Sequence, residues 1–365
     1  GRPGMTSSVL LEHLRELVAC DTQNPPRRIS GDSDIFNYCS EVVGSGFRVS
    51  TWDHGDGHVS WFAVRGEPKV LFNVHLDTVP DGDGWESDPR SLLVRNGKAH
   101  GRGACDIKGA AAALLTIAQQ QPEHMAILFT SDEEGAGGCC VQNFLDGGEG
   151  DRFTQVIVAE PTGCRAVLGH RGFLSVKTRF AGEPGHSSEA RALMDNANHQ
   201  AARWMAGALE VAESKKTAAD DPGSCLNIGI VDGGSKSNVI AGGAFIHWSA
   251  RLQPGESNDA FLEQIQACVE PGDKVSWEVP FKGEPLPAGG QDDRAAVAFC
   301  NENSLPLSGP VDFWTEASLF SKAGLPAIVM GPGQIEQAHA ADEWVALDQL
   351  ECAYRRYGRV VKNDG

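Results

Sequence analysis

The fold class of this chain is decided by two neighbouring segments, Gly109-Ala-Ala-Ala-Ala-Leu-Leu-Thr-Ile-Ala-Gln119 and Met125-Ala-Ile-Leu-Phe-Thr130. The first is small and apolar over about three helical turns, which predicts a buried helix. The second is a short apolar run bounded by polar residues, which predicts a buried strand. A helix followed closely by a buried strand is typical of an α/β sheet.

Patterns on either side of these segments extend the same sheet. Residues 10–18 carry an apolar face at helical spacing. Apolar runs at residues 61–64, 70–74 and 155–159 predict further short strands. Strands that alternate with helices indicate an α/β sheet whose ligand sites lie at the carboxyl ends of its strands.

From Gly172 the pattern changes. The expected elements are a strand at 173–180, a helix at 191–214, strands at 225–231 and 244–252, a helix at 258–269 and a strand at 274–280. This β-α-β-β-α-β order is ferredoxin-like. A helix at 295–303 and a strand at 325–330 then resume the first pattern. We therefore expect a two-domain α/β protein, with a mixed-sheet catalytic domain (residues 1–171 and 284–365) and an inserted ferredoxin-like lid (172–283).

Bulk composition limits size, partners and location. A chain of 365 residues exceeds the usual single hydrophobic core, which favours two domains. The net charge of −18 disfavours nucleic acid or an anionic membrane as a partner. No apolar run approaches the roughly 20 residues that span a bilayer, and Gly1-Arg2-Pro3-Gly4 resembles a tag remnant more than a targeting signal. We therefore expect a cytoplasmic protein.

The ten cysteines are spread over the whole chain and include one adjacent pair, Cys139-Cys140, but no C-x-x-C spacing. Zinc ribbons and redox motifs both require that spacing. We expect free thiols in a reducing compartment.

His75 and Asp77 follow the strand at residues 70–74. Residues two apart on a strand point the same way, so an imidazole and a carboxylate meet at the open end of this strand. A metal-binding histidine needs an acceptor for its other ring nitrogen, and Asp77 is a candidate. A histidine at a strand end is also common without any such role.

Asp106 stands in the glycine-rich stretch Gly101-Arg-Gly-Ala-Cys-Asp106-Ile-Lys-Gly109. This stretch matches neither phosphate-binding motif, because Asp106 takes the place of the third glycine. An acid at the entry to a helix could bind a cation or simply cap that helix.

Three adjacent acids, Asp132, Glu133 and Glu134, follow the strand at 125–130. Carboxylates crowded at the end of a buried strand repel one another unless a cation is present, although a solvated turn is the alternative. Adjacent glutamates could also divide two roles, one as a metal ligand and the other as a proton carrier.

Two further residues complete a set of possible ligands: Glu160 ends the strand at 155–159, and His339 lies in a glycine-flanked loop. The set is His75, Asp106, Glu133, Glu134, Glu160 and His339. Two imidazoles and four carboxylates at the strand ends of one sheet suit Zn, Co or Mn better than a thiolate site does.

Together these motifs resemble the M20 metallopeptidase family, in the group of acetylornithine deacetylases and succinyl-diaminopimelate desuccinylases. The matching motifs are His75-x-Asp77, Gly101-Arg-Gly-x-x-Asp106-x-Lys-Gly109, Asp132-Glu133-Glu134-Gly135, Glu160-Pro161 and Ala338-His339-x-x-Asp342-Glu343. They occur in the family order and cover the chain from end to end.

The resemblance implies a centre of two divalent metal ions, Zn or Co. The implied ligands are His75 and Glu160 on one ion, Glu134 and His339 on the other, and Asp106 as a bridge between them. Glu133 would be the general base, and Asp77 would orient His75.

The resemblance also implies roles for three residues of the inserted segment. His186, in Gly185-His186-Ser187-Ser188, would reach the active site of a partner subunit, which requires a homodimer. Asn238 and Arg251 match substrate-contact positions, and an arginine fork suits a substrate α-carboxylate. A surface-loop histidine and a surface ion pair are the alternatives for His186 and Arg251.

The implied activity is hydrolysis of a small-molecule N-acetyl amino acid to acetate and the free amino acid. The likeness favours N-acetyl-L-citrulline, in arginine biosynthesis, with N-acetyl-L-ornithine as the alternative, since no motif marks the far end of the substrate pocket. A desuccinylase or aminoacylase with the same metal site remains open. A phosphoester hydrolase or a non-enzymatic binding protein is disfavoured, because the acidic chain has no phosphate-binding loop and every implied ligand is present.

Overall fold

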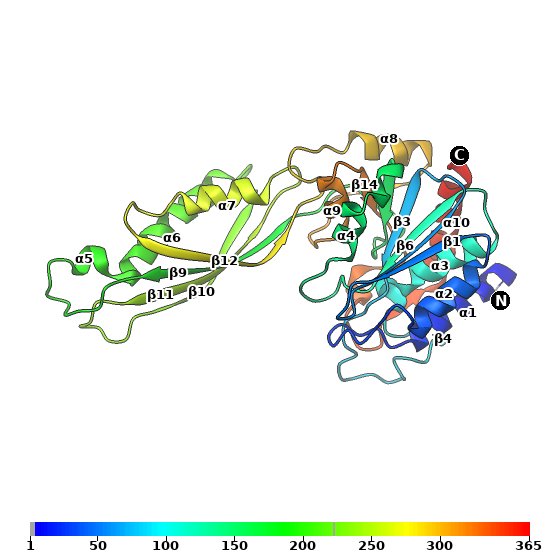
Figure 1. Cartoon of the computed structure of the whole chain (residues 1–365), viewed down its shortest axis with the longest axis horizontal. Helices are drawn as coiled ribbons and strands as arrows, with labels where there is room; N and C mark the ends of the chain where they lie inside the picture. Colours follow the sequence, from blue (N-terminus) through cyan, green and yellow to red (C-terminus); the bar gives the residue numbers. More distant parts are fainter. Residues whose placement is uncertain (1–3, 222) are drawn as a thin grey trace. The chain divides into compact units, whose positions relative to one another are not determined.

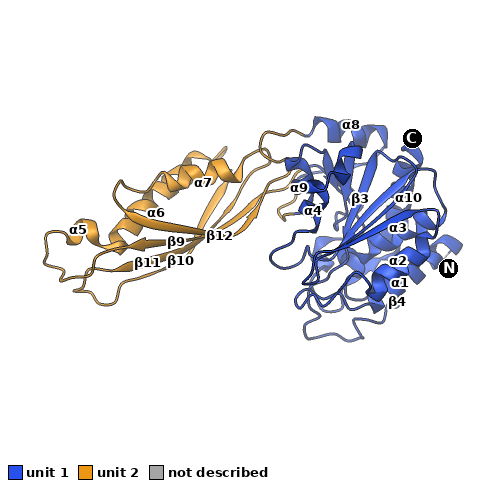
Figure 2. Cartoon of the chain, in the orientation of Figure 1, with its two compact units in different colours: residues 1–168, 293–310, 315–365 blue, residues 169–292, 311–314 orange. Residues whose placement is uncertain are grey.

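The structure is a computed structural model that describes residues 4–221 and 223–365, so all but the last residue of the opening Gly1-Arg2-Pro3-Gly4 lies outside the described part. Two compact units make up the chain (Figure 2). Unit 1 comprises Gly1–Leu168, Asp293–Pro310 and Thr315–Gly365, and unit 2 comprises Gly169–Asp292 and Val311–Trp314. The segment 172–283, expected as an inserted domain, lies within unit 2.

Unit 1 combines helices with a large sheet (Figure 1). Its helices are α1 (Met5–Ala19), α2 (Asp34–Val43), α3 (Gly109–Gln119), α4 (Cys140–Asp146), α8 (Arg294–Glu302), α9 (Ala317–Lys322) and α10 (Leu347–Asn363). Its strands are β1 (Arg48–Asp53), β2 (Val59–Arg65), β3 (Val70–His75), β4 (Leu93–Arg95), β5 (Lys98–His100), β6 (Met125–Thr130), β7 (Gln155–Val158), β8 (Ala166–Val167), β13 (Leu307–Ser308), β14 (Ala327–Val329) and β15 (Trp344–Ala346).

Among the described residues, eight strands of unit 1 form one sheet in the order β1-β2-β6-β3-β7-β14-β8-β13. Strands β6, β3, β7 and β14 pair in parallel, whereas β1, β2 and β6 pair antiparallel. The prediction of an α/β fold with a mixed sheet is therefore confirmed. Because the central strands are parallel, their carboxyl ends meet at one edge.

Helices cover both faces of this sheet (Figure 1). Helix α3 packs against α1, α2 and α10 on one face of the sheet. On the other face, α4 packs against β2, and α9 packs against β7 and β14. Every residue of β3 and β6 is buried, as is α3 from Gly109 to Ala118. Small side chains in α3 let its neighbours approach closely, which explains a run of four alanines at the centre of the unit.

Unit 2 is a four-stranded antiparallel sheet with helices (Figure 2). Its elements are β9 (Phe173–Ala181), α5 (Ala192–Asp195), α6 (Ala197–Ser214), β10 (Cys225–Gly233), β11 (Gly243–Arg251), α7 (Asn258–Gln266) and β12 (Lys274–Gly283). The strand order is β10-β11-β9-β12. Without the short α5, the elements follow the β-α-β-β-α-β order of a ferredoxin-like unit.

Alternating burial along β9 and β11 gives unit 2 its own core. Leu174, Val176, Ile246 and Trp248 point to the buried side and pack with Trp204 of α6. A strand with one face buried carries apolar side chains at every second position, which is the pattern in the sequence. Pro280 lies in β12, an edge strand, at a register shift between Glu278 and Phe281, where a missing N–H is tolerated.

The prediction of a single helix at residues 191–214 is wrong, because Asn196 separates helix α5 from helix α6. Asn196 has extended backbone angles, and its side-chain oxygen accepts hydrogen bonds from the N–H groups of Asn198 and His199. A side chain that satisfies the free N–H groups of a first turn starts a new helix there. The amphipathic pattern continues across the break, so periodicity did not reveal it.

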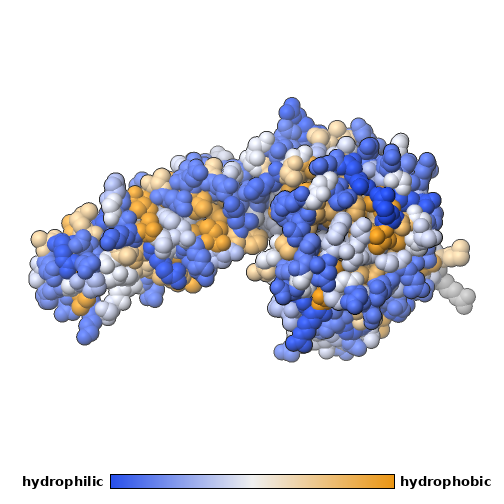
Figure 3. Space-filling view, in the orientation of Figure 1, coloured by the Kyte–Doolittle hydropathy of each residue, from blue (hydrophilic) through white to orange (hydrophobic). Residues whose placement is uncertain are grey.

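The viewed surface is mostly hydrophilic, with hydrophobic patches on both units (Figure 3). In the part of the chain that the structure covers, no helix combines the length and the apolar character that crossing a membrane requires. The ten cysteines, all within that part, are unpaired.

Candidate metal centre

Three neighbouring parallel strands of unit 1 bring the predicted ligands together. β3 ends at His75, β6 is followed by residues 132–134, and β7 is followed by Ala159 and Glu160. The order β6-β3-β7 makes these ends adjacent. His339 lies on the loop after β14, the next strand along the sheet, and Asp106 lies on the turn before α3.

His75 is buried, and its two ring nitrogens have separate surroundings. Nδ1 lies 2.9 Å from the main-chain carbonyl oxygen of Asp77, and because a carbonyl only accepts, Nδ1 carries the proton. Nε2 lies 3.2 Å from Asp106 Oδ1 and 3.1 Å from Glu160 Oε1. The lone pair of a neutral His75 therefore faces two carboxylates.

The other oxygen of Asp106 belongs to a second group. His339 Nε2 lies 2.8 Å from Asp106 Oδ2 and 3.0 Å from Glu134 Oε1. Asp106 thus has one carboxylate oxygen beside His75 and the other beside His339. It does not cap α3, because within the described residues that helix has Lys108 as its N-cap and no side-chain capping bond.

Asp77 contacts His75 differently from the expectation, because the hydrogen bond uses its main-chain carbonyl and its carboxylate oxygen lies 3.4 Å from Nδ1. The carboxylate instead accepts from the N–H groups of Glu133 (3.2 Å) and Glu134 (2.7 Å) and from Asn24 Nδ2 (3.0 Å). Asn24 also donates to the carbonyl oxygen of Glu134. The Asp77 carboxylate therefore orders the turn that carries both glutamates.

The three adjacent acids point in different directions. Asp132 Oδ2 accepts from His58 Nδ1 (2.7 Å) and from the N–H groups of Cys139 (2.7 Å) and Cys140 (3.0 Å). Glu134 reaches His339, and Glu133 Oε2 lies 3.7 Å from His75 Nε2. Only the two glutamates join the cluster, which reduces the repulsion that the sequence suggested.

A divalent cation fits this donor set. In the described chain, His75 Nε2 and Asp106 Oδ1 are buried without a hydrogen-bond partner, although they face each other. Four-coordinate Zn holds its ligand atoms at roughly 2.0–2.2 Å, which separates them by about 3.3 Å, close to the spacings found here. Within this cluster, two sets of donor atoms gather within one ion's reach, His75 with Glu133 and Glu160, and His75 with Asp106 and Glu134. A third set, His58 with Asp132 and Cys140, lies outside the cluster.

Burial and the close approach of histidines and carboxylates shift the pKa values in this cluster. Burial opposes protonation of His75, but the carboxylates of Glu160, Glu133, Asp106 and Asp77 together outweigh it and hold the pKa of His75 well above its usual value. Hydrogen bonds to Asp106 and Glu134 raise the pKa of His339 to about 10. Burial raises the pKa of Glu160 to about 8 and that of Glu133 well above its usual value. A metal ion would compete with these protons for the same atoms.

The other predicted site residues, His186, Asn238 and Arg251, all lie in unit 2. His186 is exposed, its Nδ1 lies 2.8 Å from Ser188 Oγ, and its loop pairs with Val239, next to Asn238. The Arg251 guanidinium lies over the ring of Phe173, 4.1 Å from the ring centre.

Sequence reasoning gave no role to three buried residues around the cluster. Glu343 and Arg102 form an ion pair at 2.9 Å, and both belong to motifs already quoted, which was the available signal. Glu316 is also buried, and burial, together with the charges of Asp132, Asp77 and Glu160, raises its pKa well above its usual value.

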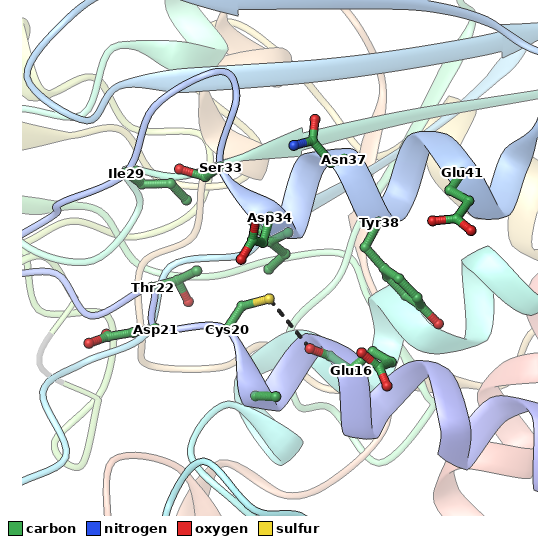
Figure 4. A pocket seen from close by; sticks show the side chains of 12 residues that line it. Glu16, Cys20, Asp21, Thr22, Ile29, Ser33, Asp34, Asn37, Tyr38 and Glu41 are labelled. Atoms are coloured by element: carbon green, nitrogen blue, oxygen red, sulfur yellow. Dashed lines mark hydrogen bonds between the residues drawn. The ribbon is translucent and has the colours of Figure 1, made fainter.

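Cavity volume does not locate this cluster. A cavity of about 720 Å³ is lined by residues of α1 and α2 and by the segment after α1, including Glu16, Cys20 and Asp34 (Figure 4). None of the clustered ligands lines it. The cluster is identified by its donor atoms.

Comparisons with known proteins show what this chain is similar to. The chain is 45% identical over 358 residues to the N-acetyl-L-citrulline deacetylase of Xanthomonas campestris pv. campestris, covering 96% of this chain and 97% of that protein. It is 30% identical to the acetylornithine deacetylase of Proteus mirabilis, covering 88% and 87%. The crystal structure of the aminopeptidase PepT from Bacillus cereus has a similar fold, with a TM-score of 0.71, 16% identity and 98% of both chains covered.

The family model described as peptidase family M20/M25/M40 matches residues 71–363, a span that contains every candidate metal ligand. With that match, and with relatives aligned over nearly the whole chain, the protein belongs to peptidase family M20/M25/M40.

Proposed function

We propose that this protein is a two-metal amidohydrolase that removes an acetyl group from an amino acid. One observation carries the proposal: the two oxygens of Asp106 lie beside different imidazoles, at 3.2 Å from His75 and 2.8 Å from His339. His75, Asp106 and Glu160 would hold one ion. Asp106, Glu134 and His339 would hold the other.

The metals and the protein residues would divide the chemistry. Two bound ions, Zn or Co, supply Lewis acidity that polarises an acyl carbonyl and makes a water more acidic. Glu133 would take the proton of the attacking water and return it to the leaving amine. Burial raises the pKa of Glu133, which favours the protonated form that donates to the leaving amine.

We assign N-acetyl-L-citrulline as the substrate, with acetate and L-citrulline as products, in arginine biosynthesis. The support is the 45% identity to a protein named for that activity, against 30% for the acetylornithine deacetylase. We also place the protein in the cytoplasm.

Unit 2 would serve as the lid and the dimerisation domain, over residues 172–283. Arg251 and Asn238 would contact substrate, and His186 would act in the site of a partner subunit. The edge strand β10 exposes Ile230 and Val231, at 52% and 56% of their surface, and an exposed apolar edge favours pairing with a second copy.

The first test is acetate release from N-acetyl-L-citrulline and N-acetyl-L-ornithine by protein loaded with Zn or Co. Glu133→Gln is the inactive variant, and Glu336→Gln is the matched control, since Glu336 is exposed. We expect activity that Glu133→Gln abolishes, and the ratio of kcat/KM values identifies the substrate. No acetate from either compound with metal bound would refute the deacetylase and direct attention to N-succinyl substrates.

The second test concerns His186. Random mixing of Glu133→Gln and His186→Ala subunits gives about one half heterodimers, each with one complete site, so activity should recover to about one quarter of wild type. No recovery in a mixture that light scattering shows to be dimeric would refute action across the subunit boundary.

A further inference from the structure

The carboxylate of Glu343 lies beneath the turn that carries Asp106. Oε1 accepts from the N–H of Gly103 at 3.1 Å, and Oε2 accepts from the N–H groups of Cys105 and Asp106, both at 2.9 Å. Glu343 is 1% exposed. Three of the main-chain donors of this turn therefore end on one buried carboxylate.

The turn needs such an acceptor because its backbone is irregular. Asp106 and Ile107 have non-helical angles, and Gly103 has a φ of 88°, in the left-handed region. Buried main-chain N–H groups that form no regular ladder must find another partner. A carboxylate that accepts several N–H groups fixes their directions, and here it fixes the direction from which the Asp106 side chain leaves the backbone.

Arg102 extends this arrangement to two more loops. Nη1 donates to Glu343 Oε1 at 2.9 Å and to the carbonyl oxygen of Ala340 at 3.0 Å. Nη2 donates to the carbonyl oxygen of Asp81 at 2.8 Å. Arg102 is 2% exposed, so the pair is a buried ion pair whose charges compensate each other.

Each loop that this pair joins follows or contains a candidate metal-centre residue. Asp81 lies on the loop after His75 and Asp77, Gly103 to Asp106 form the turn before α3, and Ala340 follows His339. These segments are far apart in the sequence. The described contacts that join all three at one point are those of Arg102 and Glu343.

We infer that Glu343 is a positioning residue for the metal centre, which aims Asp106 through its main-chain N–H groups and restrains the His339 loop through Arg102. This inference rests on the proposed metal site. It assigns Glu343 no contact with substrate or with a reacting atom.

The test is metal binding to Glu343→Gln. The amide keeps one acceptor oxygen but turns an NH₂ group toward main-chain donors, so the turn must shift. We expect at least a tenfold weaker Kd for Zn by calorimetry and an altered visible absorption spectrum of the Co-loaded protein. Glu336→Gln, the same change on the exposed side of the same loop, should match wild type in both measurements.

A purely structural role for Glu343 would lower the melting temperature of the metal-free protein and leave Kd and the Co spectrum unchanged. That result, in protein with wild-type circular dichroism, would overturn the inference. Wild-type protein that takes up no metal would instead refute the proposed metal centre, on which the inference rests.

Glu343→Asp serves as a second variant, because it keeps the charge opposite Arg102 and is therefore less disruptive if Glu343→Gln fails to fold. The shorter side chain cannot reach both Gly103 and Asp106 at the present distances. We expect the Kd and the Co spectrum of Glu343→Asp to lie between those of wild type and Glu343→Gln. If Glu343→Gln does not fold, we expect both quantities in Glu343→Asp to differ from wild type. Wild-type values for Glu343→Asp would contradict positioning by this carboxylate.

Discussion

Replacing Asp77 with Asn should destabilise the turn that carries Glu133 and Glu134 without releasing His75. The Asp77 carboxylate accepts three hydrogen bonds, from the N–H groups of Glu133 and Glu134 and from Asn24 Nδ2. The His75 ring is held by the main-chain carbonyl of Asp77, which the substitution leaves in place.

The magnitude follows from these contacts. An asparagine oxygen in the place of Oδ2 can keep the donors of Glu134 and Asn24, so only the bond from the Glu133 N–H to Oδ1 is lost, at about 1.5–3 kcal/mol. The two remaining bonds lose their charge assistance, at about 1 kcal/mol each. Removing a buried negative charge beside other carboxylates offsets roughly 1–2 kcal/mol of that loss. We therefore expect the free energy of unfolding to fall by about 1.5–4 kcal/mol. Asp77 is only 1% exposed, so water cannot replace the lost bonds.

The assay is urea unfolding in the presence of a chelator, so that metal affinity does not contribute, combined with hydrogen exchange at the N–H groups of Glu133 and Glu134. Asp53→Asn is the matched control, because Asp53 also accepts from two main-chain N–H groups but is exposed. The free energy of unfolding should fall much less in Asp53→Asn than in Asp77→Asn. Wild-type stability and wild-type exchange at Glu133 and Glu134 in Asp77→Asn would refute the assignment of this carboxylate to the turn.

Three further predictions concern catalysis, pH and helix capping. Glu133→Gln should lower kcat/KM for acetate release by about 10²–10⁴-fold, the usual contribution of a general acid–base, with little change in Zn affinity; retained activity would contradict its role. The metal-free protein should lose stability as pH rises from about 5 to 10. Burial raises the pKa of Glu160 to about 8, and the carboxylate partners of His339 raise its pKa to about 10. The folded state therefore holds these protons more tightly than the unfolded state does, and this stabilisation is lost as they dissociate. Melting temperatures measured in chelator across that range should therefore fall, and a rising trend would disprove the reasoning. Asn196→Ala should cost about 1 kcal/mol in urea unfolding by removing the cap of α6; an unchanged midpoint would show that the cap contributes little.

Uniform local patterns made part of the fold predictable. Strands β3 and β6 are buried over their whole length and helix α3 is buried from Gly109 to Ala118, so an apolar run is enough to find them. The C-terminal helix α10 was not predicted, although its buried residues Leu350, Ala353, Tyr357 and Val360 recur at helical spacing. Many charged residues lie between them and hide the apolar face.

The composition of the candidate site was also available from the sequence. Each parallel strand of the sheet centre is followed by an ionisable residue or by a loop that carries one, and parallel strands end at one edge. The identities of the possible ligands therefore follow from local sequence together with one rule of sheet geometry. The contacts of each carboxylate follow neither from local sequence nor from this rule of sheet geometry.

By itself, then, the sequence determined the fold class and the residue types that can bind metal, because both depend on patterns within one strand or helix. Only the tertiary structure decided that Asp132 turns away from its glutamate neighbours and that Asp106 lies between two imidazoles. It also decided that Glu343 holds the Asp106 turn from 237 residues away in the chain. These contacts depend on how loops distant in sequence pack against one another, and no local pattern encodes the direction in which a buried carboxylate points.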